Sequence, residues 1–209
     1  MIILGIDPGT LLMGHAVVSR TGSAISYVNM GVLNMRKVSN PTEKLATIHR
    51  KIISLIEEYH PDEFSIETPF YGKNPQSLIK LGRAQGVAIA AALSKDVPVF
   101  EYAPLKIKQS ITGVGRASKE QVWAMLCRIL NMNFNMHPKY MDASDALGAA
   151  VCHCLQFRNI AASDSSKVTA TYDSSKVTAK SSDRKKTSKN TSKNTSWEKF
   201  IITNKDRIL

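Results

Sequence analysis

Four acidic residues of this 209-residue chain adjoin apolar segments. Asp7 ends the first apolar run, Glu67 ends a later one, and Asp142 and Asp145 open an otherwise apolar stretch. A carboxylate in apolar surroundings is costly unless a cation or a hydrogen-bond donor pairs with it. Carboxylate oxygens without His or Cys suit Mg²⁺, or Mn²⁺ in its place, better than zinc. The residue types therefore predict a divalent-metal site built from these four acids.

The chemistry expected of such a site is phosphoryl transfer. Two ions about 4 Å apart stabilise both the attacking and the leaving oxygen of an in-line displacement, so no protein nucleophile is needed. Asp142 and Asp145 share one helix face, and parallel strands would place Asp7 beside Glu67. Each acid alone also has a structural interpretation: a satisfied strand end, a lysine partner, or a favourable helix dipole. The four together favour the metal site.

A glycine-containing segment is a candidate phosphate site. Gly113 and Gly115 lead into a predicted helix N-terminus that is flanked by Arg116 and Lys119. Free amides and positive side chains at a helix N-terminus bind phosphate. Lys108 lies just upstream and could reach the same backbone or the metal site. The alternative is an ordinary flexible turn, since two nearby glycines are weak evidence.

Two adjacent aromatic residues form a candidate base-stacking element. Phe70 and Tyr71 follow Glu67 in a loop that contains proline and glycine. Near an active site, such side chains can stack on unpaired bases. Aromatic residues that cap the core beneath a loop are an equally open alternative.

The chain is basic, with a formal net charge of +11 and a pI of about 9.6. This excess favours a nucleic acid over an anionic membrane as partner. Residues 158–209 hold 12 Lys and Arg against 5 Asp and Glu, so the C-terminal region supplies most of the charge. Neither a signal peptide nor a membrane-spanning stretch is expected.

The three cysteines are an odd number without a framework spacing, which favours reduced thiols in a cytoplasmic protein. The sequence Cys152-His153-Cys154 also permits a zinc interpretation. A second ligand cluster is missing, so buried thiols on a helix are the favoured interpretation.

Periodicity and capping residues predict an α/β fold, with a five-stranded mixed sheet covered by helices on both faces. Strands are expected at Ile2–Asp7, His15–Arg20, Ile25–Leu33, Glu63–Glu67 and Val97–Tyr102. Helices are expected to begin after Asn40, Asn74 and Ser118, to end near Pro61, Ser94 and Leu130, and to include a last helix from Asp142 to about Phe157. Residues 1–157 are expected to form one domain. Residues 158–209 contain short Ser/Thr/Lys-rich repeats and are predicted to be disordered.

These residues together resemble the RuvC family of Holliday-junction resolvases. The similarity runs from about Ile2 to Phe157, essentially the whole predicted domain. Its motifs are Gly5-Ile6-Asp7-Pro8-Gly9, Ile66-Glu67 with Phe70 and Lys73-Asn74, Lys80–Gly86, Val99–Tyr102, Gly113–Val122 and Asp142–Leu147. The first motif alone is not specific, whereas the ordered set is highly specific.

The resemblance implies an RNase H-like fold and a Mg²⁺-dependent endonuclease that resolves four-way DNA junctions by paired symmetric nicks in recombination and repair. It assigns metal binding and catalysis to the four acids, and cleavage and DNA contact to Lys108 and Lys119. It implies that Phe70 stacks on a base near the junction centre. Further DNA contacts are expected from Tyr71, Lys73, Arg83, Gly113, Gly115 and Arg116.

The resemblance also implies a homodimer, with RuvA and RuvB branch-migration proteins as partners. The helix after Asn74 would lie at the dimer interface, where Gly82 and Gly86 permit close packing. Two departures from the family pattern stand out. Residues 10–15 differ from the family pattern on both sides of Gly14. The segment after Phe157 has no recognisable family counterpart.

Three rival functions share part of this pattern. The first motif also resembles the phosphate loop of actin-like sugar kinases, but those enzymes need two such domains. A small RNase H-like family that processes ribosomal RNA precursors shares the first motif but does not predict Phe70 together with the helix at Lys73–Gly86. A non-catalytic junction-binding protein would have no need of the complete acid set.

Overall fold

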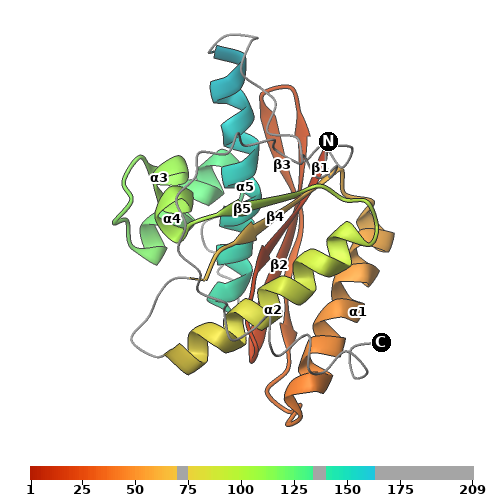
Figure 1. The fold of residues 1–209 in the computed structure, drawn as a ribbon. Coiled ribbons are helices and arrows are strands. Elements are labelled where there is room, and N and C mark those ends of the chain that lie inside the picture. The colour runs from red at the N-terminus through yellow and green to blue at the C-terminus, as the bar shows by residue number, and fades with distance from the viewer. Residues whose placement is uncertain (70–74, 134–139, 163–209) are drawn as a thin grey trace, which may run out of the picture. The chain divides into compact units, whose positions relative to one another are not determined.

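The computed structural model describes residues 1–69, 75–133 and 140–162. Within these ranges the chain forms a five-stranded sheet with helices on both faces (Figure 1). The predicted stacking loop at residues 70–74 and nearly all of the predicted tail, from residue 163 onward, lie outside the described residues.

The sheet combines an antiparallel meander with two parallel strands. β1 (Ile2–Asp7), β2 (Leu12–Thr21) and β3 (Ala24–Asn34) pair antiparallel. β4 (Glu63–Glu67) and β5 (Val99–Tyr102) continue the sheet in parallel, in the order β3-β2-β1-β4-β5. Short turns connect the antiparallel strands and helices connect the parallel ones, as strand geometry requires. The predicted mixed sheet is confirmed.

Two helical layers cover the sheet (Figure 1). α1 (Pro41–Tyr59) and α2 (Pro75–Leu93) pack on one face, while α3 (Pro104–Thr112), α4 (Lys119–Ile129) and α5 (Met141–Ala162) pack on the other. Each face of the sheet has its own hydrophobic core, and neighbouring residues of β1 pack into different cores because side chains alternate along a strand. Ile3 packs in the core that contains α5, and Leu4 packs in the core that contains α1.

Capping side chains explain where α1 and α4 begin. The Asn40 side chain accepts hydrogen bonds from the first amides of α1. At α4, Ser118 Oγ accepts from the Gln121 amide at 3.2 Å, and the Gln121 side chain accepts from the Ser118 amide at 2.8 Å. Such caps satisfy amides that have no partner inside the helix. Both predicted helix starts are confirmed.

The observed elements differ from the predicted ones in several places. β2 begins at Leu12, three residues before its predicted start at His15. The sequence patterns did not reveal α3, which has 9 residues and an N-cap, Ala103, without a side-chain acceptor. β5 begins at Val99 rather than at Val97, because the Val97 amide donates to Ala92 O and belongs to the turn after α2. α5 continues to Ala162, beyond its predicted end near Phe157.

The cysteine thiols are buried and free, as the favoured interpretation predicted: Cys127, Cys152 and Cys154. Burial raises the pKa of each thiol. Within the described ranges, no group of three His, Cys, Asp or Glu side chains could hold a metal, so the zinc interpretation gains no support. No helix in the part of the chain that the structure describes is long and apolar enough to span a membrane.

Candidate active site

β1 and β4 bring two of the predicted acids to one edge of the sheet. The strands pair in parallel with Ile6 opposite Ile66. The next residues, Asp7 and Glu67, therefore leave the sheet side by side. Ile6 and Ile66 are fully buried, so the apolar strands hold this edge in place. The predicted adjacency of the two acids is confirmed.

α5 brings the other two acids to the same edge. Asp142 lies in the first turn of α5, and its backbone lies against β2. A Cβ on Gly14, which pairs with Asp7 across the strands, would be 1.9 Å from Asp142 O. A Cβ on Gly5 would be 2.3 Å from Ala146 O. The absence of a side chain at both glycines lets the helix approach the strands this closely.

The four acids lie close enough to oppose one another's ionisation. Burial and the charges of the other three acids raise the pKa of Asp7 to about 8. Burial, followed by the charge of Asp145, raises the pKa of Glu67 to about 7, although two nearby lysines act in the opposite direction. Such a cluster needs positive charge before all its members can ionise. Strongly shifted carboxylates of this kind are typical of functional sites.

Both predicted catalytic lysines contact this region. Lys119 Nζ lies 2.6 Å from Asp145 Oδ2 in a partly exposed ion pair. Burial lowers the pKa of Lys119, but the hydrogen bond to Asp145 and the charges of the acids outweigh burial and raise it. Lys108 Nζ donates to Ala117 O at 2.9 Å, which ties α3 to the loop before α4. Lys119 thus brings positive charge to the acids, and Lys108 supports the neighbouring backbone.

The donor set fits a hard divalent cation. The acids offer only oxygen ligands, and their burial and mutual repulsion favour a cation among them. Within the described ranges, however, no three such side chains are grouped closely enough to hold one ion. The four carboxylates are therefore not gathered around one point in this structure. The residues that would hold the metal are Asp7, Glu67, Asp142 and Asp145.

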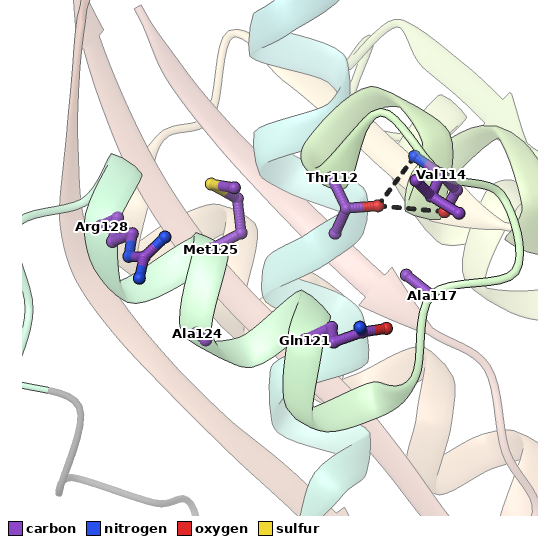
Figure 2. Close-up of a pocket in the computed structure, with 7 residues that line it drawn as sticks. All are labelled: Thr112, Val114, Ala117, Gln121, Ala124, Met125 and Arg128. Carbon is purple, nitrogen blue, oxygen red and sulfur yellow. Dashed lines mark hydrogen bonds between the residues drawn. The ribbon is translucent and has the colours of Figure 1, made fainter.

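The predicted phosphate-binding loop uses several of its own amides. Gly113 ends α3 with a left-handed φ of 76°. The Val114 amide donates to Thr112 Oγ1 at 3.1 Å (Figure 2), and the Ser118 amide donates to Gln121 at 2.8 Å. These two amides are not free to bind phosphate. The predicted phosphate site therefore loses part of its expected backbone donors. The cationic side chains of the loop remain as its candidate phosphate contacts.

A pocket of about 290 Å³ lies between this loop and α4 (Figure 2). Its walls are Thr112, Val114, Ala117, Gln121, Ala124, Met125 and Arg128. None of the four acids lines it, so this pocket is separate from the predicted catalytic centre.

A second, more open hollow is lined by one of the four acids and by an arginine that the sequence patterns did not single out. Arg36 and Asp142 both line it, together with the loop after Asp7. The Arg36 guanidinium lies 5.9 Å from the centre of the Tyr140 ring. The available signal was the pair Arg36-Lys37, which follows β3 at the edge of the sheet where β1 ends.

The remaining predicted DNA contacts fall into two groups. Those within the described ranges are all accessible to solvent: Arg83, Gly113, Gly115 and Arg116. The other three lie outside the described residues: Phe70, Tyr71 and Lys73.

A mixed sheet of this order, with acids at the ends of β1 and β4 and at the start of α5, defines an RNase H-like nuclease of the metal-dependent class. The family described as crossover junction endodeoxyribonuclease RuvC matches residues 3–153. The chain belongs to the RuvC family.

Close relatives carry the same description. The crossover junction endodeoxyribonuclease RuvC of Cytophaga hutchinsonii is 56% identical over 162 residues, which cover 78% of this chain and 80% of that protein. The protein of the same description from Bacteroides fragilis is 57% identical over 155 residues, covering 74% of this chain and 82% of that protein. The predicted family is confirmed.

A solved structure supports the same conclusion. The Thermus thermophilus RuvC structure in complex with a Holliday junction substrate matches with a TM-score of 0.70 and 28% identity. The match covers 76% of this chain and 96% of that chain. The predicted RNase H-like fold is confirmed.

Proposed function

We propose that this chain resolves Holliday junctions, cutting four-way DNA by paired symmetric nicks in recombination and repair. The observation that carries the proposal is the meeting of four acids at one sheet edge in a chain of the RuvC family. The relative from Thermus thermophilus is described in complex with a Holliday junction substrate, which supports the choice of substrate.

The residues of the site suggest a division of labour. Asp7, Glu67, Asp142 and Asp145 would hold Mg²⁺, or Mn²⁺ in its place, with two ions expected in each site. When bound, the ions would stabilise the charge that develops on the scissile phosphate. Lys119, whose ammonium contacts Asp145, would neutralise part of the same charge. Lys108 would keep the adjoining loop in place, so that exposed Arg116 can contact a neighbouring phosphate.

We also propose a homodimer that uses the exposed face of α2. A Cβ at Gly82 or at Gly86 would meet nothing within 4 Å, so both glycines face outward. Ile79 and Leu93 lie on the same helical face and are 57% and 55% exposed. A two-fold dimer would present two equal active sites, which suits two symmetric nicks.

Family membership suggests two further assignments. RuvA and RuvB branch-migration proteins are the proposed partners, since a resolvase acts on the junctions that branch migration moves. The proposed location is the cytoplasm, in agreement with three free thiols.

The decisive experiment offers the protein a synthetic four-way junction, a linear duplex of the same sequence and an RNA hairpin, each with Mg²⁺. We expect paired nicks at symmetric positions in the junction and little cutting of the other two substrates. Asp7→Asn is the matched control, expected to bind the junction without cutting it. Cutting of the hairpin alone would favour RNA processing, and junction binding without any cutting by the unchanged protein would favour a non-catalytic role.

A further inference from the structure

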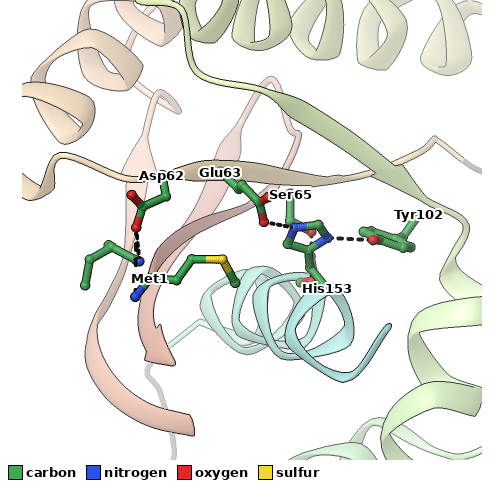
Figure 3. Close-up of polar contacts among 8 residues, drawn as sticks. Met1, Asp62, Glu63, Ser65, Tyr102 and His153 are labelled. Carbon is green, nitrogen blue, oxygen red and sulfur yellow. Dashed lines mark hydrogen bonds and ion pairs between the residues drawn. The ribbon is translucent and has the colours of Figure 1, made fainter. Parts of the chain in front are cut away.

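Besides the two acids at its start, α5 carries a buried histidine held between two polar partners (Figure 3). His153 is 1% exposed. Its Nδ1 lies 2.6 Å from the Tyr102 hydroxyl, and its Nε2 lies 2.6 Å from a carboxylate oxygen of Glu63. A buried polar network is tolerated when its members satisfy one another, and this requirement restricts their positions.

The chemistry of the two ends determines the direction of each hydrogen bond. The ionised carboxylate of Glu63 can only accept, so the Nε2–H of His153 donates to it. Nδ1 of the neutral ring then accepts the proton of the Tyr102 hydroxyl. Burial lowers the pKa of His153 and raises the pKa of Tyr102, which keeps both side chains in the neutral forms that this arrangement needs.

This network joins the two elements that carry most of the catalytic acids. His153 follows Asp142 by eleven residues on α5, about three turns along the same face of the helix. Glu63 is the first residue of β4, and Glu67 is the last. The hydrogen bond between His153 and Glu63 therefore links the helix of Asp142 to the strand of Glu67.

Tyr102 provides a second link, close to Glu67 itself. In the β4–β5 pair, Tyr102 lies opposite Glu67. The Tyr102 carbonyl accepts a hydrogen bond from the Thr68 amide at 2.9 Å, directly after Glu67. The backbone of Tyr102 thus holds the end of β4, while its side chain reaches His153 on α5.

Two further contacts bring the same surfaces together. Phe100 packs on the His153 ring with centroids 4.4 Å apart. Ser65 Oγ donates to Ala149 O at 2.8 Å, one helical turn before His153. Ring packing permits small shifts, whereas two directional hydrogen bonds to different strands restrict both sliding and rotation of the helix. The network is thus suited to define how α5 sits on the sheet.

We propose that His153 is a positioning residue for the metal-binding acids: through Glu63 and Tyr102 it holds α5 in the register on β4 and β5 that lets Asp142 and Glu67 share a metal site. The proposal rests on the metal-dependent nuclease function proposed above. About 16 Å of helix separates His153 from Asp142, so His153 acts through the backbone rather than by touching the substrate.

The test compares His153→Phe with His153→Gln. Phenylalanine retains a ring but makes neither hydrogen bond, whereas glutamine can still donate one and accept one. Ile52→Ala is the control for a general loss of stability, because Ile52 is a buried residue of α1, on the opposite face of the sheet from α5. For each folded protein, Mn²⁺ binding is measured without DNA, and junction affinity and single-turnover cleavage are measured separately.

We expect His153→Phe to weaken Mn²⁺ binding and to slow cleavage about 10- to 100-fold, with junction affinity within about threefold of the unchanged protein. His153→Gln should recover much of both losses. Ile52→Ala should lower the melting temperature and leave Mn²⁺ binding and cleavage unchanged.

A second pair of variants covers the case in which His153→Phe does not fold. Tyr102→Phe removes one hydroxyl and should weaken Mn²⁺ binding in the same direction by a smaller factor. Its matched control is Tyr27→Phe, which removes a hydroxyl from a partly buried ring on β3 in the same core. This control should bind Mn²⁺ normally.

Unchanged Mn²⁺ binding in Tyr102→Phe and in the folded His153 variants would overturn the proposal. Losses in His153→Phe no larger than those of Ile52→Ala would overturn it as well. Failure of the unchanged protein to cut a junction would count against the proposed function instead, since the Mn²⁺ titration contains no DNA.

Discussion

Asp7 keeps its proton over a pH range in which an exposed aspartate has lost it. Burial and the neighbouring acids raise its pKa from 3.8 to about 8. Between these two values the folded chain retains a proton that the unfolded chain has released, so the free energy of unfolding falls as the pH rises. The carboxylate that the site needs for metal binding therefore opposes folding at neutral pH.

Asp7→Asn should accordingly stabilise the metal-free protein. Asparagine is neutral without taking up a proton, so it avoids the cost of protonating the buried carboxylate, and we expect a gain of about 1–3 kcal/mol near neutral pH. The gain should shrink as the pH falls to 3.8 and below, where the aspartate becomes protonated in the unfolded state as well as in the folded one. Thermal unfolding over this pH range is the measurement.

Added Mg²⁺ provides the internal control for this prediction. It should raise the melting temperature of the unchanged protein more than that of Asp7→Asn, because a ligand stabilises the folded state that binds it. An asparagine variant with unchanged stability at every pH would contradict the proposed cost of burying Asp7.

At the scale of secondary-structure elements, the position of α5 decides whether the acids can act together. Gly14 and Gly5 set its closest approach to the strands, and His153 links it to β4 and β5. The acids on α5 are thus held by contacts along much of the helix. A small change at any of these contacts should shift the positions of the acids, because a closely packed helix moves as a rigid unit.

Gly14→Ala tests this dependence. The new methyl group would lie 1.9 Å from Asp142 O, so the start of α5 must move away from β2. We expect a loss of about 1–3 kcal/mol in the free energy of unfolding and a larger proportional loss of cleavage than of junction binding. Denaturant unfolding and single-turnover cleavage are the measurements.

Gly82→Ala is the matched control, since its new methyl group would meet nothing within 4 Å. It should leave the monomer equally stable or more stable by up to about 1 kcal/mol, because alanine favours helix over glycine. A normal cleavage rate in Gly14→Ala would show that catalysis does not depend on the close contact between the start of α5 and β2.

At the scale of the whole molecule, paired nicking requires two active sites, and the outward face of α2 is the proposed contact between protomers. Gly86→Glu should disrupt that contact, because it places a charge and a long side chain on the face. The monomer should keep its stability, since this position is open. Sedimentation measures the oligomeric state, and junction cleavage distinguishes paired from single nicks.

Ala46→Glu is the control for Gly86→Glu, because Ala46 is an exposed alanine of α1. It should leave association unchanged. A Gly86→Glu protein that associates like the unchanged chain would exclude this face as the interface.

The basic C-terminal region is expected to contribute only non-specific attraction to DNA. A chain that ends at Ala162 keeps α5 complete and loses 11 Lys and Arg and 5 Asp and Glu. Cleavage at low salt should stay within about twofold, while the salt dependence of junction binding should become shallower. Binding titrations over a range of salt concentrations measure the slope, and a folded truncation that no longer cuts would show that the region takes part in catalysis.

Local chemistry made much of this protein predictable. The cap at Asn40, the capping box at Ser118 and the apolar runs before Asp7 and Glu67 depend on residues near one another in the chain, so their structural consequences follow from the sequence. The order of the elements predicted a mixed sheet, and the structure showed that β1 pairs with β4 in parallel. α3 escaped prediction because it is short and lacks a capping side chain.

Contacts between distant segments needed the tertiary structure. The sequence by itself determined that the sheet is mixed, that the chain belongs to the RuvC family and which four acids are the candidate metal ligands, because residue type and order carry that information. Only the fold decided that Lys119 contacts Asp145, that Gly14 touches the start of α5, and that His153 lies between two strands. These contacts join residues that are remote in sequence, and their energies depend on distances that are defined only when the sheet and both helical layers have packed.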